Sequence, residues 1–202
     1  MLKFTAALIA APLLFAVAAH ATATDSNRSQ PATASLALLD RMEARFQDRQ
    51  CLAPEVSKVD VAWHLAHSIK VIEEIHKELD ASDPKAYRAN LNPLRALAFA
   101  RGKLPRGKAK SPSVVLPPDV NTLEDLERQA ATARTALLAW TQLPERSFFV
   151  HPVFGRLKRD HAERFIEIHT EHHLAIIADI VAVCPSSPDS ERRDAEGLSP
   201  LD

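Results

Sequence analysis

Four stretches of the chain carry apolar residues at the three- and four-residue spacing of an amphipathic helix. They span residues 35–50, 59–79, 121–140 and 158–183. The second stretch is apolar on two faces, one of which contains Leu65 and Ile69 and the other Trp63 and Val71, so we expect it to be buried between neighbouring helices. Glycines are few and β-branched runs are rare, and the pattern therefore predicts an all-α fold.

A long connection separates the second and third stretches. Residues 84–120 contain several prolines, a group of lysines and arginines, and one segment, 87–99, that can form a short helix. Such long connections are more often functional or disordered than inert, and these basic residues either meet an anionic group or form a solvated loop. Since a long connection lets the second and third helices run parallel, we expect a four-helix bundle in up-down-down-up order over residues 34–184, with a structured turn at 141–155.

The first residues have the order of a secretory signal peptide. A short basic start precedes an apolar stretch and then small residues, which predicts a signal peptide over residues 1–21 and cleavage after Ala21 or Ala23. The rival interpretation is an N-terminal membrane anchor, but the apolar stretch is short for a span. We therefore expect a secreted or periplasmic protein without a stable membrane span after cleavage, a polar linker at 22–33 and a disordered tail at 185–202.

Composition narrows the range of functions. Hydrophobic residues make up 46% of the 202-residue chain, enough for a packed core. The formal net charge is −1, so no nucleic-acid partner is expected. No Ser-His-Asp order, glycine-rich phosphate loop or C-x-x-C motif is present, which leaves nucleophilic hydrolases, nucleotide-binding proteins and dithiol redox proteins without support.

The chain has two cysteines, Cys51 and Cys184. In the predicted bundle Cys51 precedes the second helix and Cys184 ends the fourth, so both lie at the same end. In an oxidising compartment such a pair favours a disulfide. The alternative is two unrelated buried thiols.

Five of the nine histidines cluster in two helical segments, "WHLAHS" and "HTEHHL". His169 and His173 are four residues apart and present two imidazoles to one point. A third ligand from a neighbouring helix would complete a metal site with open positions, and His67 fits this role by depth and face, with His64 one turn away in reserve. The alternative is that these histidines are satisfied by carboxylates or are simply exposed. His172 lies about 100° from the pair and is expected to support packing.

The segments "WHLAHS" and "HPVFGRL" followed by "HTEHHL" resemble the DinB-like metal-binding bundle superfamily, in its branch named domain of unknown function 1569. The resemblance covers residues 35–183 and implies the same up-down-down-up bundle. It also implies one ligand on the second helix and an i, i+4 pair on the fourth, at His67, His169 and His173. The chain departs from the superfamily where many members have Gln, since Ile176 and Ile177 stand there.

Two functions of different classes follow. The first is an exported protein that binds a divalent metal (Zn, Ni or Fe) and acts as a transferase or hydrolase on a thiol or water. His64, Glu171, His172 and His151 are the candidates to orient the ligand imidazoles or to reach the mouth of the site. The second is a non-catalytic exported helical bundle that binds a small ligand or a protein partner.

Overall fold

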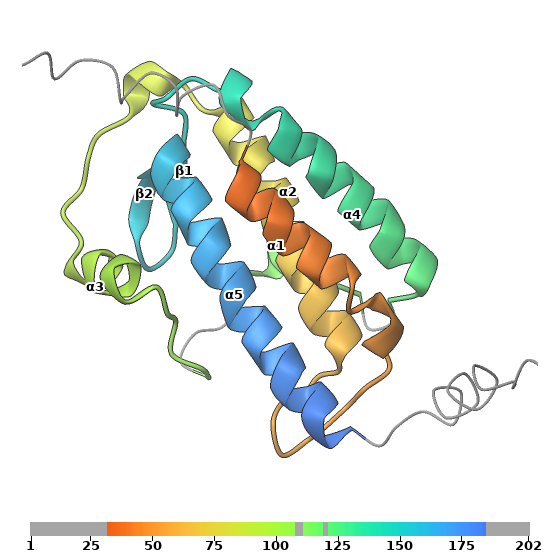
Figure 1. The fold of residues 1–202 in the computed structure, drawn as a ribbon. Coiled ribbons are helices and arrows are strands. Elements are labelled where there is room, and N and C mark those ends of the chain that lie inside the picture. Colours follow the sequence, from red (N-terminus) through yellow and green to blue (C-terminus); the bar gives the residue numbers. More distant parts are fainter. Residues whose placement is uncertain (1–31, 108–110, 119–120, 185–202) are drawn as a thin grey trace, which may run out of the picture. The chain divides into compact units, whose positions relative to one another are not determined.

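The computed structural model describes residues 32–107, 111–118 and 121–184. In these residues it contains five α-helices and one two-stranded sheet, so the predicted all-α class is confirmed (Figure 1). The helices are α1 (Thr33–Glu43), α2 (Val61–Ala81), α3 (Pro93–Arg101), α4 (Leu123–Leu138) and α5 (Arg159–Val183), and the strands are β1 (Phe148–His151) and β2 (Gly155–Lys158). The predicted signal peptide, the tail and all but the last two linker residues lie outside the described residues.

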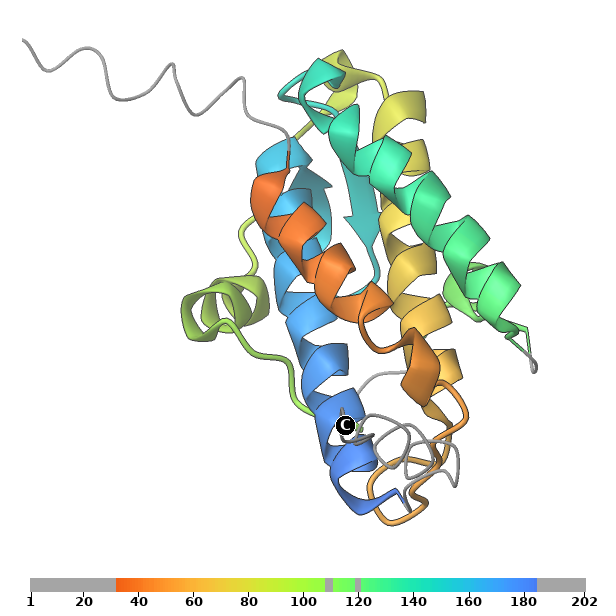
Figure 2. The same cartoon turned by 45° about the vertical axis from the view of Figure 1, so that its right-hand side comes forward.

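The four longest helices pack around one core. Both α1 and α2 contact α4 and α5, so α1 and α2 lie diagonally across the bundle. In Figures 1 and 2, α2 and α4 run in one direction while α1 and α5 run in the other. The connection between α2 and α4 passes outside the bundle and carries α3 beside α5.

Helix α2 forms the centre of the packing because one predicted apolar face is fully buried and the other is buried at Val71 and partly buried at Trp63. Leu65, Ile69 and Ile72 have no exposed surface. The helix is capped by Asp60, whose side chain accepts a hydrogen bond from the backbone N–H of Trp63 at 2.8 Å.

None of the helices in the described part of the chain is long and apolar enough to cross a membrane.

Two helices end earlier than the apolar spacing predicts. The stretch 35–50 is helical only to Glu43, and a 3₁₀ turn at Phe46–Asp48 follows. The stretch 121–140 is helical to Leu138, and a 3₁₀ turn starts at Trp140. Phe46 and Trp140 are nevertheless buried, because the tighter turns still direct them into the core. Because both residues are buried, the apolar spacing in the sequence continues past the residues at which the two helices end.

The predicted turn at 141–155 contains the first part of a β-hairpin that runs to Lys158 and that the sequence did not indicate. Strand β1 pairs antiparallel with β2, with Phe149 opposite Leu157. Gly155 has φ +71°, and a Cβ there would lie 2.4 Å from Nδ2 of Asn90. Both the backbone conformation and the close approach of Asn90 therefore favour glycine at this position. Asn90 belongs to the crossover and donates to the carbonyl of Phe154 at 3.3 Å, which attaches the crossover to the hairpin.

Cys51 and Cys184 are joined by a disulfide with a Cα–Cα distance of 5.7 Å. It ties the segment before α2 to the residue that directly follows α5. The backbone carbonyl of Cys51 also accepts from the N–H of Val61, the first residue of α2, at 3.0 Å. The start of α2 and the end of α5 are thereby held at one end of the bundle.

Candidate metal centre

Three buried histidines from two helices meet inside the bundle. His67 comes from α2, and His169 and His173 come from successive turns of α5. One ring nitrogen of each lies within 4.8 Å of the others. In a tetrahedral site with zinc–nitrogen bonds of about 2.1 Å two donors lie about 3.4 Å apart, so rings at the 4.8 Å limit need to approach each other by about 1.4 Å to share one ion. These are the three residues that the sequence favoured, and His64 is not part of the group.

Aromatic packing fixes the orientation of these rings. The His169 and His173 rings lie 4.5 Å apart, and that of His67 lies 5.1 and 4.9 Å from them. Trp63, one turn before His67, stacks on its ring at 4.8 Å with an interplanar angle of 22°. Phe165 lies 5.5 Å from His169 on the other side.

A carbonyl of the crossover selects the tautomer of His67. Nδ1 of His67 lies 2.8 Å from the backbone oxygen of Val115, which can only accept, so Nδ1 carries the proton. The lone pair is therefore on Nε2. The hydroxyl of Ser111 lies 3.5 Å from that nitrogen. A ligand imidazole held through its other nitrogen is the usual arrangement in metal sites.

His64 supports His173 in a similar way. Nδ1 of His64 lies 2.9 Å from Nδ1 of His173, and Nε2 of His64 lies 2.9 Å from the hydroxyl of Ser57. In one tautomer His173 donates to His64 and His64 donates to Ser57, which leaves Nε2 of His173 with a free lone pair. His64 is therefore positioned to orient a ligand.

His169 has an unsatisfied buried nitrogen. Its Nδ1 is buried and has no hydrogen-bond partner in the described residues. An unpaired buried polar atom is costly, and a cation bound at Nδ1 would satisfy it. This orphaned nitrogen, together with the tautomer of His67, fits a divalent metal.

Burial keeps the cluster neutral. Desolvation lowers the pKa of His67, against the opposing effect of the Val115 carbonyl, and lowers those of His169 and His173 well below the ordinary value. It also lowers the pKa of His64 to about 4, with a further contribution from His67. At neutral pH the ligand nitrogens therefore do not have to lose a proton before they bind a metal.

The two remaining histidine candidates, His172 and His151, lie in different environments. His172 is half-buried, and its ring is perpendicular to that of His173 at 5.2 Å, as expected for a neighbour outside the group of three. His151 closes the hairpin turn, because its Nδ1 accepts from the backbone N–H groups of Val153 and Phe154, both at 3.1 Å. Its ring lies 4.7 Å from that of Phe165, so one aromatic ring separates His151 from His169.

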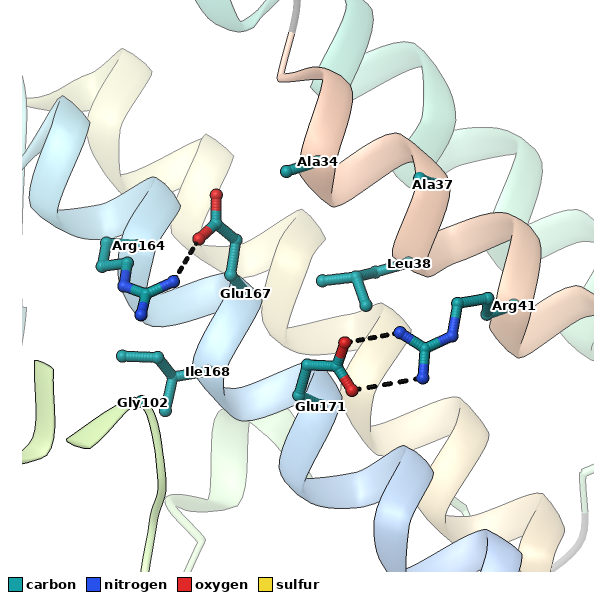
Figure 3. A pocket seen from close by; sticks show the side chains of 9 residues that line it. All are labelled: Ala34, Ala37, Leu38, Arg41, Gly102, Arg164, Glu167, Ile168 and Glu171. Atoms are coloured by element: carbon teal, nitrogen blue, oxygen red, sulfur yellow. Dashed lines mark hydrogen bonds and ion pairs between the residues drawn. The ribbon is translucent and has the colours of Figure 1, made fainter.

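Glu171 does not orient a ligand, and this expectation needs correction. Its carboxylate accepts two hydrogen bonds from Arg41 of α1, at 2.5 and 3.2 Å, on another face of α5 from the histidines. Figure 3 shows this pair in a surface groove of about 340 Å³ between α1 and α5. Arg164 and Glu167 form a second ion pair there, at 2.7 Å. The groups that hydrogen-bond to the clustered histidines are instead the Val115 carbonyl, which contacts His67, and His64, which contacts His173.

Comparison with known proteins places the chain in one family. A family model described as a protein of unknown function, DUF1569, matches residues 42–179 and so includes α2, the hairpin and most of α5. No curated protein and no solved structure matches the chain. The matched region contains all three clustered histidines and the hairpin turn beside them. The chain therefore belongs to the DUF1569 family.

Proposed function

We propose that this protein is an exported helical bundle in which His67, His169 and His173 hold one divalent metal ion that serves a reaction of water or a thiol. The observation that carries this proposal is the convergence of three buried imidazoles within 4.8 Å. Three neutral nitrogen donors suit Zn, Ni or Fe better than Mg or Ca, which prefer oxygen. No protein carboxylate belongs to the group of three.

The surrounding residues support a reactive site rather than a closed structural one. Three protein ligands leave at least one position open for another molecule, as in catalytic zinc centres. An ion at this position would act as a Lewis acid and lower the pKa of a bound water or thiol. Ser111 lies beside Nε2 of His67, and its hydroxyl is placed to contact a molecule that enters from the crossover side.

Two further parts of the proposal rest on sequence. The resemblance to the DinB-like superfamily, several members of which transfer low-molecular-weight thiols in the cytoplasm, supports the fold and the metal site more than the reaction, so thiol and water are both kept as candidate nucleophiles. The signal-like N-terminus favours export, and the Cys51–Cys184 disulfide is compatible with an oxidising compartment.

Metal analysis of protein purified without a histidine tag tests the site. We expect about one equivalent of Zn, Ni or Fe in the wild type, since three ligands of this kind bind such ions tightly. His67→Ala and His173→Ala should lose it. His161→Ala is the matched control, because His161 also lies on α5 but outside the group, and it should retain the metal. Equal and negligible metal in all four proteins, after exposure to each ion, would contradict the proposal.

Substitution with Co²⁺ separates the two functional classes. A cobalt spectrum that changes when a small thiol is added indicates an open position and favours the enzyme. A spectrum that does not change favours the non-catalytic bundle.

A further inference from the structure

The crossover carries an apolar surface that faces away from the bundle. Leu91, Leu94 and Leu97 are 100%, 61% and 48% exposed, although leucine normally packs inside. Leu94 and Leu97 are three residues apart on α3 and share a side of that helix. Val153 of the hairpin is 45% exposed and lies beside them, since its carbonyl accepts a hydrogen bond from Asn92. These four residues are called the α3 platform below.

The platform is held in place by polar contacts beneath it. Asn92 caps α3 by accepting from the backbone N–H of Arg95 at 2.9 Å, and it donates to the carbonyl of Val153 at 2.9 Å. Arg95 donates to the carbonyls of Asn90 and Arg156 at 2.6 and 3.2 Å. The leucines are therefore displayed on a helix that is attached to the hairpin.

Positive charges flank the platform along the chain. Every charged residue from Pro84 to Pro118 is a lysine or an arginine, although the whole chain has a net charge of −1. Arg88 precedes Leu91 by three residues, Arg101 and Lys103 follow Leu97 by four and six, and all three are exposed. Arg88 donates to backbone carbonyls, and the ion pairs found among the described residues include none of these three.

We propose that the α3 platform docks onto an anionic lipid bilayer. Leucines on one side of a short helix would enter the boundary between headgroups and acyl chains, while the flanking cations meet lipid phosphates. A second copy of the chain is a poorer occupant, because two platforms facing each other would bring their positive charges together. Only a few leucines are involved, so the binding is reversible and dependent on salt. The proposal does not depend on the metal site.

A local fluorescent probe tests this contact in the full chain. The native cysteines are paired, so Leu94→Cys adds a single reactive thiol for an environment-sensitive fluorophore. Leu138→Cys is the matched control, because Leu138 is 56% exposed but lies on α4. With mixed phosphatidylcholine–phosphatidylglycerol vesicles we expect a blue shift at position 94 and none at position 138. Vesicles of phosphatidylcholine alone should give a much smaller shift.

Removal of the flanking positive charges tests whether the contact with lipid is electrostatic. In the labelled Leu94→Cys chain, the combined substitutions Arg88→Gln, Arg101→Gln and Lys103→Gln should weaken vesicle binding about tenfold or more. Equal shifts at positions 94 and 138, equal binding to neutral vesicles, or no shift with any vesicle would overturn the proposal. A shift that grows with protein concentration in the absence of lipid would also overturn it, by identifying a second copy as the occupant.

Discussion

Removal of the Cys51–Cys184 disulfide should destabilise the folded chain by several kcal/mol. The bond joins residues 133 positions apart. In the loop-entropy treatment, a closed loop of this size restricts the unfolded chain by about 5 kcal/mol at 25 °C, and losses on removing native disulfides are typically about 2–5 kcal/mol. The bond also connects the two helices that carry the three clustered histidines, so its loss should loosen the metal centre as well.

Urea unfolding of the Cys51→Ser/Cys184→Ser variant measures this loss. With a slope of about 2 kcal/mol per molar urea, the midpoint should fall by about 1–2.5 M. Wild-type protein unfolded in the presence of a reductant is the matched control and should give the same lowered midpoint. If the oxidised wild type and the double variant differ by less than about 0.2 M, the loop-entropy reasoning is wrong for this chain.

Three further predictions concern single residues. Gly155→Ala should cost about 2–4 kcal/mol of unfolding free energy, because its φ is positive and the new Cβ would meet Asn90; a Tm within a degree or two of the wild type would contradict this. Asp60→Ala should lower the free energy of unfolding by about 1 kcal/mol, since the cap on the N–H of Trp63 is lost, whereas Asp60→Asn should retain most of it. Burial lowers the pKa of His151 from 6.5 to about 4, so the unfolded chain takes up a proton at this site before the folded chain does. The contribution of the neutral imidazole to the free energy of unfolding is therefore complete above pH 6.5 and is lost as the pH falls towards 4. Over this interval the free energy of unfolding of the wild type should fall by about 2 kcal/mol more than that of His151→Asn. Parallel pH profiles of the two proteins in chemical denaturation would exclude the effect.

The sequence was most informative where an apolar stripe and a chemical motif shared a helix. In α2 and α5 the buried face was visible from spacing, and His67, His169 and His173 fell on it. Helical periodicity therefore fixed both which residues are buried and which imidazoles meet. The choice between His67 and His64 as the third histidine required a further estimate, namely how far each lies along its helix from the end of the bundle.

Other features carried too weak a signal. The strands of the hairpin have four residues each and are separated by a turn that contains Pro152, so no clear alternation marks them. The carbonyl of Val115 acts through the backbone, which any residue would supply. Glu171 lies between His169 and His173 in sequence, but its position on the helix does not reveal its partner. Its actual partner, Arg41, is 130 positions away on another helix.

If His67 holds a metal, its hydrogen bond to Val115 would make the crossover a reporter of metal occupancy. A metal on Nε2 of His67 favours the proton on Nδ1, and that proton favours the crossover conformation in which the Val115 carbonyl accepts it. Metal binding and this crossover conformation therefore stabilise each other by the same free energy. Lys103 and Arg106 lie earlier in the same crossover and are exposed, and they offer cleavage sites to trypsin. We expect added metal to slow cleavage there in the wild type and to leave the rate unchanged in His67→Ala. Limited proteolysis would then measure occupancy in crude extracts, without knowledge of the substrate.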